Sequence, residues 1–401
     1  VAMSYYKEGA WWTSPYNEIE DVKEAAFPQK PIQIHDATLR DGEQTPGVVF
    51  TETNKIKIAE MLIEAGINRI EAGMPAISEA DFRSIQDIAK RYPQASIYSF
   101  VRAMKKDIDM SRDAGVKGVV IEIPIGYPKL RYQFHWTWEN VLEKSIDCIN
   151  YAKSQGLDVV YFPYDTTRAR LEDLENLMRG IMNYAPPHSV GVVDTMGCAL
   201  PQAIQFLVRK MTDWTDGLPV EVHTHNDFGM AVATELAGAA AGAQVLHSCI
   251  NGLGERTGNA SLEELALNLS ILMNGQLNVD FIKLRELCLF VSEITGLPIP
   301  KNKPFTGARN YTRESGIGVD LVMKEPLAMF ATDPRYFGRQ GEIVLGKKSG
   351  KASIEYYLQQ EGICASPEQV AEILDRVKTL GTEKKRLISK DEFLKIVYTV
   401  C

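Results

Sequence analysis

The sequence contains six cysteines but no pair with the CxxC spacing. This argues against a zinc–sulfur cluster or a disulfide framework, and we expect reduced thiols in a cytoplasmic protein. No apolar run reaches the roughly 18 residues that a membrane span needs, and the first residues lack the basic, apolar, small-residue order of a signal peptide. The formal net charge of -8 disfavours nucleic acid and anionic membranes as partners. What remains is a soluble globular protein.

Short runs rich in β-forming residues alternate with amphipathic helical stretches across residues 31–275. The eight runs are IQIHDAT, NRIEAG, ASIYSF, GVVIEIP, DVVYFPY, SVGVVDT, PVEVHTH and VLHSCI. Strand–helix alternation requires parallel strands, and eight such units in about 250 residues match the size of a (β/α)8 barrel. The alternative is a doubly wound open sheet, but no GxGxxG motif follows the first run. The sequence therefore predicts an α/β fold, a TIM barrel.

The remaining residues are expected to flank this catalytic barrel. Residues 276–401 are predicted to form a mostly helical C-terminal extension, with helices over 282–296 and 366–385. A Pro-rich linker, LPIPKNKPFTG, separates them. Residues 1–30 contain the aromatic segment SYYKEGAWWTSPY. We expect an N-terminal arm that packs on the barrel or on a partner subunit, because exposed tryptophans usually find an apolar cover; a lid over the site is the alternative.

Charged side chains gather where predicted strands end. Arg40 and Asp41 follow the first strand in HDATLRDGEQTPG, and His223 and His225 end the seventh. Barrel active sites lie at the C-terminal ends of the strands, and strand positions i and i+2 point to one face. One carboxylate and two imidazoles form a recurring divalent-metal set, compatible with Mg, Mn, Co or Zn. The alternative is two structural histidines near an ion pair.

Two further residues extend this predicted metal site. Asn259, in the loop after the eighth strand, could offer its amide oxygen to the metal, or could cap the helix that begins at 260–261. Thr195, at the end of the sixth strand, could hold a carboxylate, and Asp194 could orient a neighbour. A metal polarises a carbonyl, and Arg40 adds positive charge where an enolate or alkoxide oxygen develops. We therefore predict a site that makes or breaks a carbon–carbon bond beside a carbonyl.

Five motifs, in order, resemble those of the DRE-TIM metallolyase superfamily: ATLRDGEQ, EAGMPAIS, VVDTMG, EVHTHNDFGMAVA and NGLGERTGNASLEEL. HTHNDFGMA followed by GERTGNA, with SGIGVD and VLGKKSG in the extension, resembles the condensing branch of isopropylmalate, homocitrate and citramalate synthases. The resemblance implies metal ligands at Asp41, His223 and His225, with Asn259 close to the metal.

The same resemblance implies roles for other residues. Arg40 would stabilise the oxyanion, Thr195 would bind the carboxylate of a 2-oxo acid, and Gln44 and Arg102 would line the pocket. It also implies a homodimer that exchanges C-terminal subdomains. The large regulatory domain of many isopropylmalate synthases does not follow the extension, so leucine-type feedback through such a domain is not expected.

Three positions depart together from the condensing pattern. Tyr164, in PYDTTR, stands where those enzymes have Glu, Gly318 where they have His, and Met329 where they have Tyr. In the resembling enzymes, these residues form the network that deprotonates acetyl-CoA and handles the thioester. Tyr164 could act as a general acid–base if the metal or Arg168 lowers its pKa.

The loop PIGYPKLRYQFHWTW is also unlike the family's shorter polar motif. Its Lys129, Arg131 and His135 lie among aromatic residues and could bind an anionic or aromatic substrate; an interface loop is an equal alternative.

Three functions remain open from these patterns. The first is metal-dependent condensation of an acyl-CoA with a 2-oxo acid, which is favoured because the whole extension follows the condensing branch. The second is a metal-dependent aldolase or lyase acting on a hydroxy-oxo acid without acetyl-CoA, which suits the altered network. The third, a non-catalytic metal-binding protein, is least favoured because the ligand set retains its oxyanion arginine.

Overall fold

The computed structural model describes residues 5–274 and 277–401. The chain forms two compact units, each described separately below. One runs from Tyr16 to Ile299, and the other joins the first residues, up to Pro15, to the segment Pro300–Cys401. Among the described helices, none combines the length and the apolar character that a membrane crossing requires.

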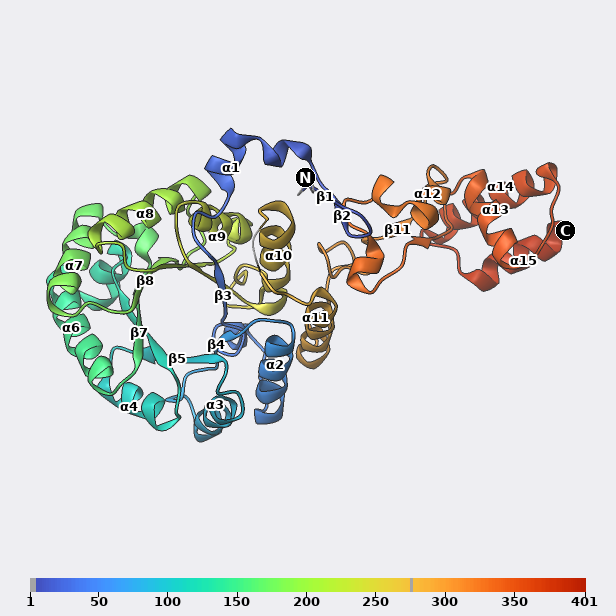
Figure 1. Ribbon diagram of the computed structural model, residues 1–401. Coiled ribbons are helices and arrows are strands. Elements are labelled where there is room, and N and C mark those ends of the chain that lie inside the picture. The colour runs from blue at the N-terminus through green and yellow to red at the C-terminus, as the bar shows by residue number, and fades with distance from the viewer. Residues whose placement is uncertain (1–4, 275–276) are drawn as a thin grey trace. The chain divides into compact units, whose positions relative to one another are not determined.

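The larger unit contains a closed barrel of eight parallel strands, which confirms the predicted fold (Figure 1). The strands are β3 (Gln33–Asp36), β4 (Arg69–Glu71), β5 (Ser96–Arg102), β6 (Gly118–Pro124), β7 (Asp158–Tyr164), β8 (Ser189–Asp194), β9 (Val220–Thr224) and β10 (Val245–Ser248). Each predicted run overlaps one of them, and β5 extends two residues beyond its run. The barrel closes where β10 pairs with β3, with Val245 opposite Gln33 and Ser248 opposite Asp36.

Helices surround the barrel, as the alternation of strands and helices predicts (Figure 1). They are α2 (Glu52–Glu64), α3 (Glu79–Arg91), α4 (Lys105–Asp113), α6 (Trp138–Ser154), α7 (Leu171–Tyr184), α8 (Pro201–Trp214), α9 (Ala231–Ala240) and α10 (Leu262–Leu267). Local sequence fixes several of their starts. Thr51 caps α2 by accepting from the Asn54 backbone N–H, and Pro201 opens α8, where its missing N–H is no loss. A short helix, α5 (Tyr127–Lys129), follows β6.

An apolar cluster packs inside the barrel. The interior cluster consists of Tyr98, Phe100, Val120, Val160, Phe162 and Val193. These residues alternate along their strands, as inward-pointing positions of a barrel do. Gly191, on β8, has no Cβ, and this allows the Phe162 ring of the neighbouring strand to approach its backbone.

The expected domain boundaries differ from those of the two units. The boundary expected between residues 275 and 276 lies outside the described residues, and the barrel unit continues through α11 (Phe281–Thr295). The expected arm of residues 1–30 is divided between the units. Its second half, with α1 (Glu20–Ala26), belongs to the barrel unit, where α1 packs on α9.

The first part of that arm belongs to the smaller unit. There, β1 (Tyr6–Lys7) and β2 (Trp11–Trp12) form a hairpin. The Trp12 backbone N–H donates to the Ala331 carbonyl at 2.8 Å, and the Asp333 N–H donates to the Ala10 carbonyl at 2.7 Å. The Trp11 ring meets Tyr336 edge to face, with centroids 5.7 Å apart. Trp11 therefore finds its cover within the chain, whereas Trp12 is 52% exposed.

The rest of the smaller unit is mostly helical, as predicted. Its elements are β11 (Thr312–Arg313), α12 (Val319–Lys324), β12 (Glu342–Ile343), α13 (Lys351–Gln360), α14 (Pro367–Lys384) and α15 (Lys390–Val400). The last three helices share an apolar core that includes Ile354, Ile373 and Phe393. Ser366 and Gln369 form a capping box at the start of α14, where the sequence predicts a helix.

The close approach at Gly191 generates a stability prediction. Gly191→Ala would place a methyl group inside the space of the Phe162 ring, so we expect the free energy of unfolding to fall by about 1 to 3 kcal/mol. Denaturant titration measures this. Phe162→Leu should be less destabilising in the Gly191→Ala background than in the wild type, because the smaller side chain relieves the overlap. Additive effects would contradict the packing argument.

Candidate active site

A cavity of about 220 Å³ opens at the C-terminal ends of the barrel strands. Polar side chains supplied by β3, β6, β7, β8, β9 and the loops that follow the strands dominate its lining. They are Arg40, Asp41, Gln44, Glu122, Lys129, Tyr164, Thr195, His223, His225, Glu255 and Arg256. The structure therefore brings together most of the residues that the sequence singled out, at the end of the barrel where they were expected.

The three expected metal ligands converge in this cavity. The Nε2 atoms of His223 and His225 lie 3.1 and 3.5 Å from Oδ2 of Asp41, and all three side chains are buried. Burial opposes ionisation of Asp41, but Arg40 and the two imidazoles outweigh it and hold the pKa of the carboxyl well below its usual range. Burial also lowers the pKa of His225 to about 4. An ionised carboxylate and a neutral imidazole are the forms that bind a metal.

Buried acceptor atoms beside these ligands fit a cation. Oδ1 of Asp41 and Oδ1 of Asn259 are buried, and neither has a hydrogen-bond partner among the described residues. A buried acceptor without a partner is unfavourable by an amount comparable to a lost hydrogen bond. A divalent ion held by oxygen and imidazole donors would satisfy both atoms. Asp41, His223 and His225, with the Asn259 oxygen nearby, could therefore hold such an ion.

The alternative role of Asn259 as a helix cap is wrong. The N-cap of α10 is Ser261, and the Asn259 amide instead donates from Nδ2 to the Leu253 carbonyl at 3.1 Å. That hydrogen bond fixes the amide orientation and leaves the oxygen atom directed elsewhere. The backbone of Asn259 also forms a bridge with that of His225, which keeps the amide beside the ligand set.

Arg40 is fixed by a carboxylate that the sequence analysis missed. Its guanidinium donates to Glu71, at the end of β4, and stacks on the Phe100 ring with 4.5 Å between Cζ and the centroid. Burial opposes the charge on Arg40, but Glu71 and Asp41 raise its pKa above the ordinary value. Arg40 is therefore a permanent positive charge with one orientation. Glu71 ends the strand in NRIEAG, just as Asp41 follows the first strand, and that parallel could have identified it.

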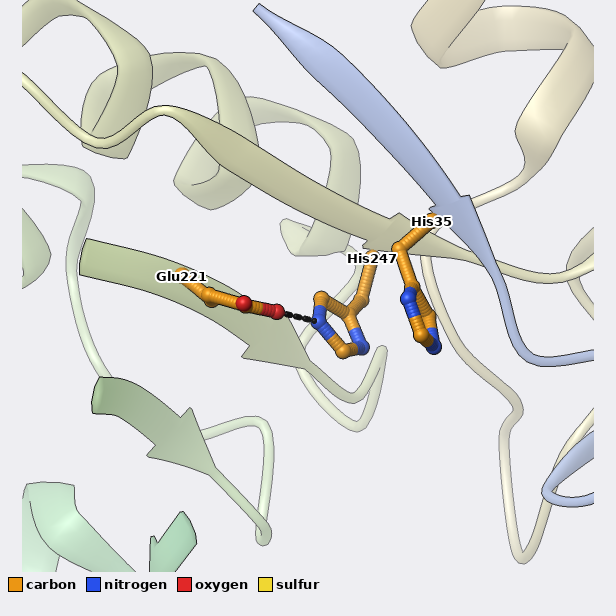
Figure 2. Close-up of side chains that lie close together, drawn as sticks. All are labelled: His35, Glu221 and His247. Atoms are coloured by element: carbon orange, nitrogen blue, oxygen red, sulfur yellow. Dashed lines mark hydrogen bonds and ion pairs between the residues drawn. The ribbon is translucent and has the colours of Figure 1, made fainter. Parts of the chain in front are cut away.

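A buried network also lies behind the candidate metal ligands. His247 Nε2 lies 2.8 Å from Glu221 Oε2, and Glu221 Oε1 accepts hydrogen bonds from Arg69 and Ser189, both at 2.6 Å. His35 stacks on His247 with ring centroids 4.1 Å apart (Figure 2). The strands β3, β4, β8, β9 and β10 each contribute one of these polar residues, although a barrel interior is normally apolar.

This network determines how His223 faces the cavity. Burial lowers the pKa of His247 well below its ordinary value, so the ring is neutral. With Nε2–H donating to Glu221, its Nδ1 must be an acceptor, and it lies 3.4 Å from Nδ1 of His223. His223 therefore donates through Nδ1–H, which leaves the Nε2 lone pair available for a cation held jointly with Asp41. Partners of this kind commonly orient metal-binding histidines.

His35, Glu221 and His247 could be read as a second metal site, since their ligand atoms lie within 4.8 Å of one another. The contacts favour a hydrogen-bonded network instead. Glu221 is already neutralised by Arg69, and the rings of His35 and His247 are stacked at 20° rather than directed at one point. His35 Nε2 also pairs with Glu71 at 3.0 Å, which connects the network to the partner of Arg40.

The environment of Tyr164 contradicts one expectation. Burial, together with the charges of Glu122 and Asp165, raises the pKa of Tyr164 above its ordinary value. Arg168 does not offset this rise in pKa, because its guanidinium forms a bidentate salt bridge with Asp165, with distances of 2.8 and 2.7 Å. The hypothesis that Arg168 lowers the Tyr164 pKa is therefore wrong. The side chain keeps its proton and offers the cavity a hydroxyl.

Of the four other residues expected to contact the substrate, three line the cavity and one does not. Gln44 and Lys129 line the cavity, and Lys129 Nζ donates to Gln133 at 3.1 Å. Thr195 also lines it, and its hydroxyl accepts from the Asp165 backbone N–H at 2.8 Å. Arg102 does not line the cavity.

The Arg102 side chain is 56% exposed and pairs with Asp107 at 2.8 Å. Asp194 accepts hydrogen bonds from the Thr167 hydroxyl at 2.7 Å and from the Ala199 N–H at 3.0 Å, so it orients its neighbours as expected. Burial raises the pKa of the Cys198 thiol, which disfavours a nucleophilic thiolate.

Two positions that depart from the condensing pattern meet in the smaller unit. Gly318 precedes α12 with a φ of 77°, and a Cβ built on it would lie 2.7 Å from the Met329 sulfur. Met329 packs on the cluster formed by Val319, Val322 and Ile343. Neither position offers a group that transfers protons.

Comparison with known proteins identifies the family. The HMGL-like family model matches residues 31–291, and the model for the homocitrate synthase post-HMGL domain-like region matches residues 305–385. A probable 2-isopropylmalate synthase of Ignicoccus hospitalis is 40% identical over 371 residues, which are 92% of each chain. The homocitrate synthase AksA of Methanocaldococcus jannaschii is 38% identical, over 99% of this chain and 96% of its own.

A putative (R)-citramalate synthase of Archaeoglobus fulgidus is 37% identical, over 90% of this chain and 73% of its own. Among solved structures, a hydroxymethylglutaryl-CoA lyase of Pseudomonas aeruginosa superposes with a TM-score of 0.59 at 19% identity, covering 68% of this chain and 95% of the lyase. That likeness supports the barrel fold alone. The relatives extend over both units of the chain. The protein belongs to the HMGL-like DRE-TIM family, in its condensing branch, and is an acyltransferase of the isopropylmalate and homocitrate synthase type.

Proposed function

We propose that the protein uses a divalent cation to condense an acyl-CoA with a 2-oxo acid. The observation that carries this proposal is the ligand set of Asp41, His223 and His225 beside the permanently charged Arg40, with unpartnered acceptor oxygens on Asp41 and Asn259. The names of the full-length relatives support the substrate class, since all are synthases that join an acyl group to a 2-oxo acid.

Asp41, His223 and His225 would hold the cation, with the Asn259 oxygen close to it, and Mg, Mn, Co and Zn all suit these donors. A bound cation would polarise the carbonyl of the 2-oxo acid. Arg40 would donate to the oxygen on which negative charge develops, and Glu71 keeps the guanidinium in place for this role. Thr195 would bind the acid's carboxylate, and Gln44 and Lys129 would contact the rest of the substrate.

The proposed reaction has two stages, bond formation and thioester cleavage. The α C–H bond of the acyl group breaks, its electron pair forms a carbon–carbon bond to the oxo carbon, and the oxo oxygen takes up the proton. Water then cleaves the thioester and releases CoA as a free thiol. A homodimer and a cytoplasmic location remain predictions that accompany this function.

The test is thiol release from acetyl-CoA with a panel of 2-oxo acids, in the presence of Mg or Mn and with a chelated control. Release that depends on both the metal and the oxo acid would support the proposal. No release from protein shown to hold metal would reject it in favour of the aldolase or lyase alternative, which a panel of hydroxy-oxo acids would then examine.

The ligand set predicts the effect of Asp41→Asn. Loss of the ionised carboxylate should reduce bound metal to background and abolish thiol release, because the cation loses its one charged ligand. Elemental analysis of the purified protein measures the metal. Asp109→Asn, on α4 and outside the cavity lining, is the control and should retain both. Normal metal content in Asp41→Asn would exclude Asp41 as a ligand.

The buried network predicts a second effect. His247→Phe keeps a ring stacked on His35 but removes the acceptor for His223 Nδ1–H. We expect metal affinity to fall by about 10 to 100-fold. Losing a residue that hydrogen-bonds to a metal-binding histidine has an effect of this size. Metal titration by calorimetry measures the dissociation constant, with exposed His188→Phe as the control. Equal affinities for His247→Phe and wild type would show that the network does not orient the ligand.

A further inference from the structure

Glu122 is the charged residue that interrupts the apolar strand β6, GVVIEIP. Its side chain is half-buried and lines the active-site cavity together with Arg40 and Tyr164. Hydrogen bonds and ion pairs fix the neighbouring charged groups, but none of those found in the described part of the chain involves the Glu122 carboxylate. A carboxylate directed into a reaction cavity without a structural partner is available to a substrate.

The register of the barrel places Glu122 beside the altered position 164. Along the β6–β7 ladder, Glu122 lies opposite Phe162, and Pro124 lies opposite Tyr164. Glu122 is therefore on the neighbouring strand, two ladder positions farther than Tyr164 from the C-terminal end of the barrel. The two side chains are close enough for the Glu122 charge to raise the Tyr164 pKa. A carboxylate is thus present in this part of the cavity, on a different strand from the one where condensing enzymes have it.

The other groups of the cavity are poorly suited to accept a proton from carbon. Tyr164 keeps its proton, because its pKa is raised. Glu255 is 55% exposed and is already paired with Arg256 at 3.5 Å. Asp41 belongs to the proposed ligand set. Burial raises the pKa of Glu122 to about 7, with Arg40 opposing the shift, and a general base works best with a pKa near the working pH.

We propose that Glu122 is the general base of the condensation, taking the proton from the carbon next to the acyl thioester. This inference rests on the proposed function. The electron pair of the broken C–H bond forms the new bond to the oxo carbon, and the proton passes from Glu122 to the oxygen of the former oxo group. The step is balanced and needs no reactant other than the two substrates.

The same position explains why two departures in the smaller unit are tolerated. Gly318 and Met329 carry no proton-transfer group and pack against each other. With the base supplied by β6, deprotonation would not depend on either position. The cavity would also keep a neutral Tyr164 hydroxyl beside the base, where it can donate a hydrogen bond.

The experiment compares Glu122→Gln with wild type in steady-state thiol release, using metal-loaded protein, acetyl-CoA and the 2-oxo acid that the wild type prefers. We expect kcat to fall by about 100-fold or more. Metal content and the dissociation constant of the 2-oxo acid should stay within about 3-fold, as expected for loss of a base rather than of a ligand. Exposed Glu172→Gln should leave all three unchanged.

The pH profile separates a base from a structural residue. In the wild type, kcat/KM should fall as pH decreases and Glu122 becomes protonated; this acidic limb should be absent from the residual activity of Glu122→Gln. Glu122→Asp retains the carboxylate one methylene shorter, so its kcat should exceed that of Glu122→Gln. The melting temperature of Glu122→Gln at pH 8 should not fall, because burial disfavours the ionised carboxylate in the folded state.

The outcomes distinguish this inference from the function on which it rests. If wild type releases no thiol with any 2-oxo acid, the proposed function fails. If wild type does, but Glu122→Gln retains kcat within about 3-fold and keeps the acidic limb, the function stands and Glu122 is not the base. A fall in kcat accompanied by an equal loss of metal would also overturn the inference, because it would assign Glu122 to the cation.

Discussion

The pairing of β10 with β3 is the constraint on which the rest of the structure depends. It joins segments that lie more than two hundred residues apart and converts a row of strands into a closed barrel. Closure sets His247 directly opposite His35 in the ladder, and it brings the loop after β3 to the end of β9. Asp41 can meet His223 only because these ends of the sheet meet. The proposed metal ligands therefore depend on the same hydrogen bonds that hold the fold together.

Much of this could be predicted from the sequence, because the informative patterns were local. Strand and helix periods, capping residues and the spacing of His223 and His225 each need only a few neighbouring residues. What could not be predicted depends on partners from distant strands. Nothing near His247 in the sequence indicates Glu221 or His35, and nothing near Tyr164 indicates Glu122. The pair that Arg102, at the end of β5, forms with buried Asp107 of α4, and the orientation of the Asn259 amide, were equally hidden, since both depend on which side-chain rotamer is adopted.

The polar groups inside the barrel follow one electrostatic logic. Each buried cation has a carboxylate: Arg40 has Glu71, and Arg69 has Glu221. The buried imidazoles His225 and His247 are neutral, so they add no charge that would need a partner. Against this background of paired charges, the unpartnered acceptors of Asp41 and Asn259 and the carboxylate of Glu122 stand out. Low dielectric makes unpaired groups expensive, and enzymes tend to concentrate them where the chemistry occurs.

The packing of Gly318 against Met329 bears on which substitutions the protein accepts. A side chain at residue 318 would begin in a left-handed backbone conformation and meet the methionine sulfur 2.7 Å away. Replacing the glycine with histidine would therefore first require a smaller or displaced neighbour at residue 329. The two positions are therefore coupled, because a side chain at residue 318 can be accommodated only after a change at residue 329.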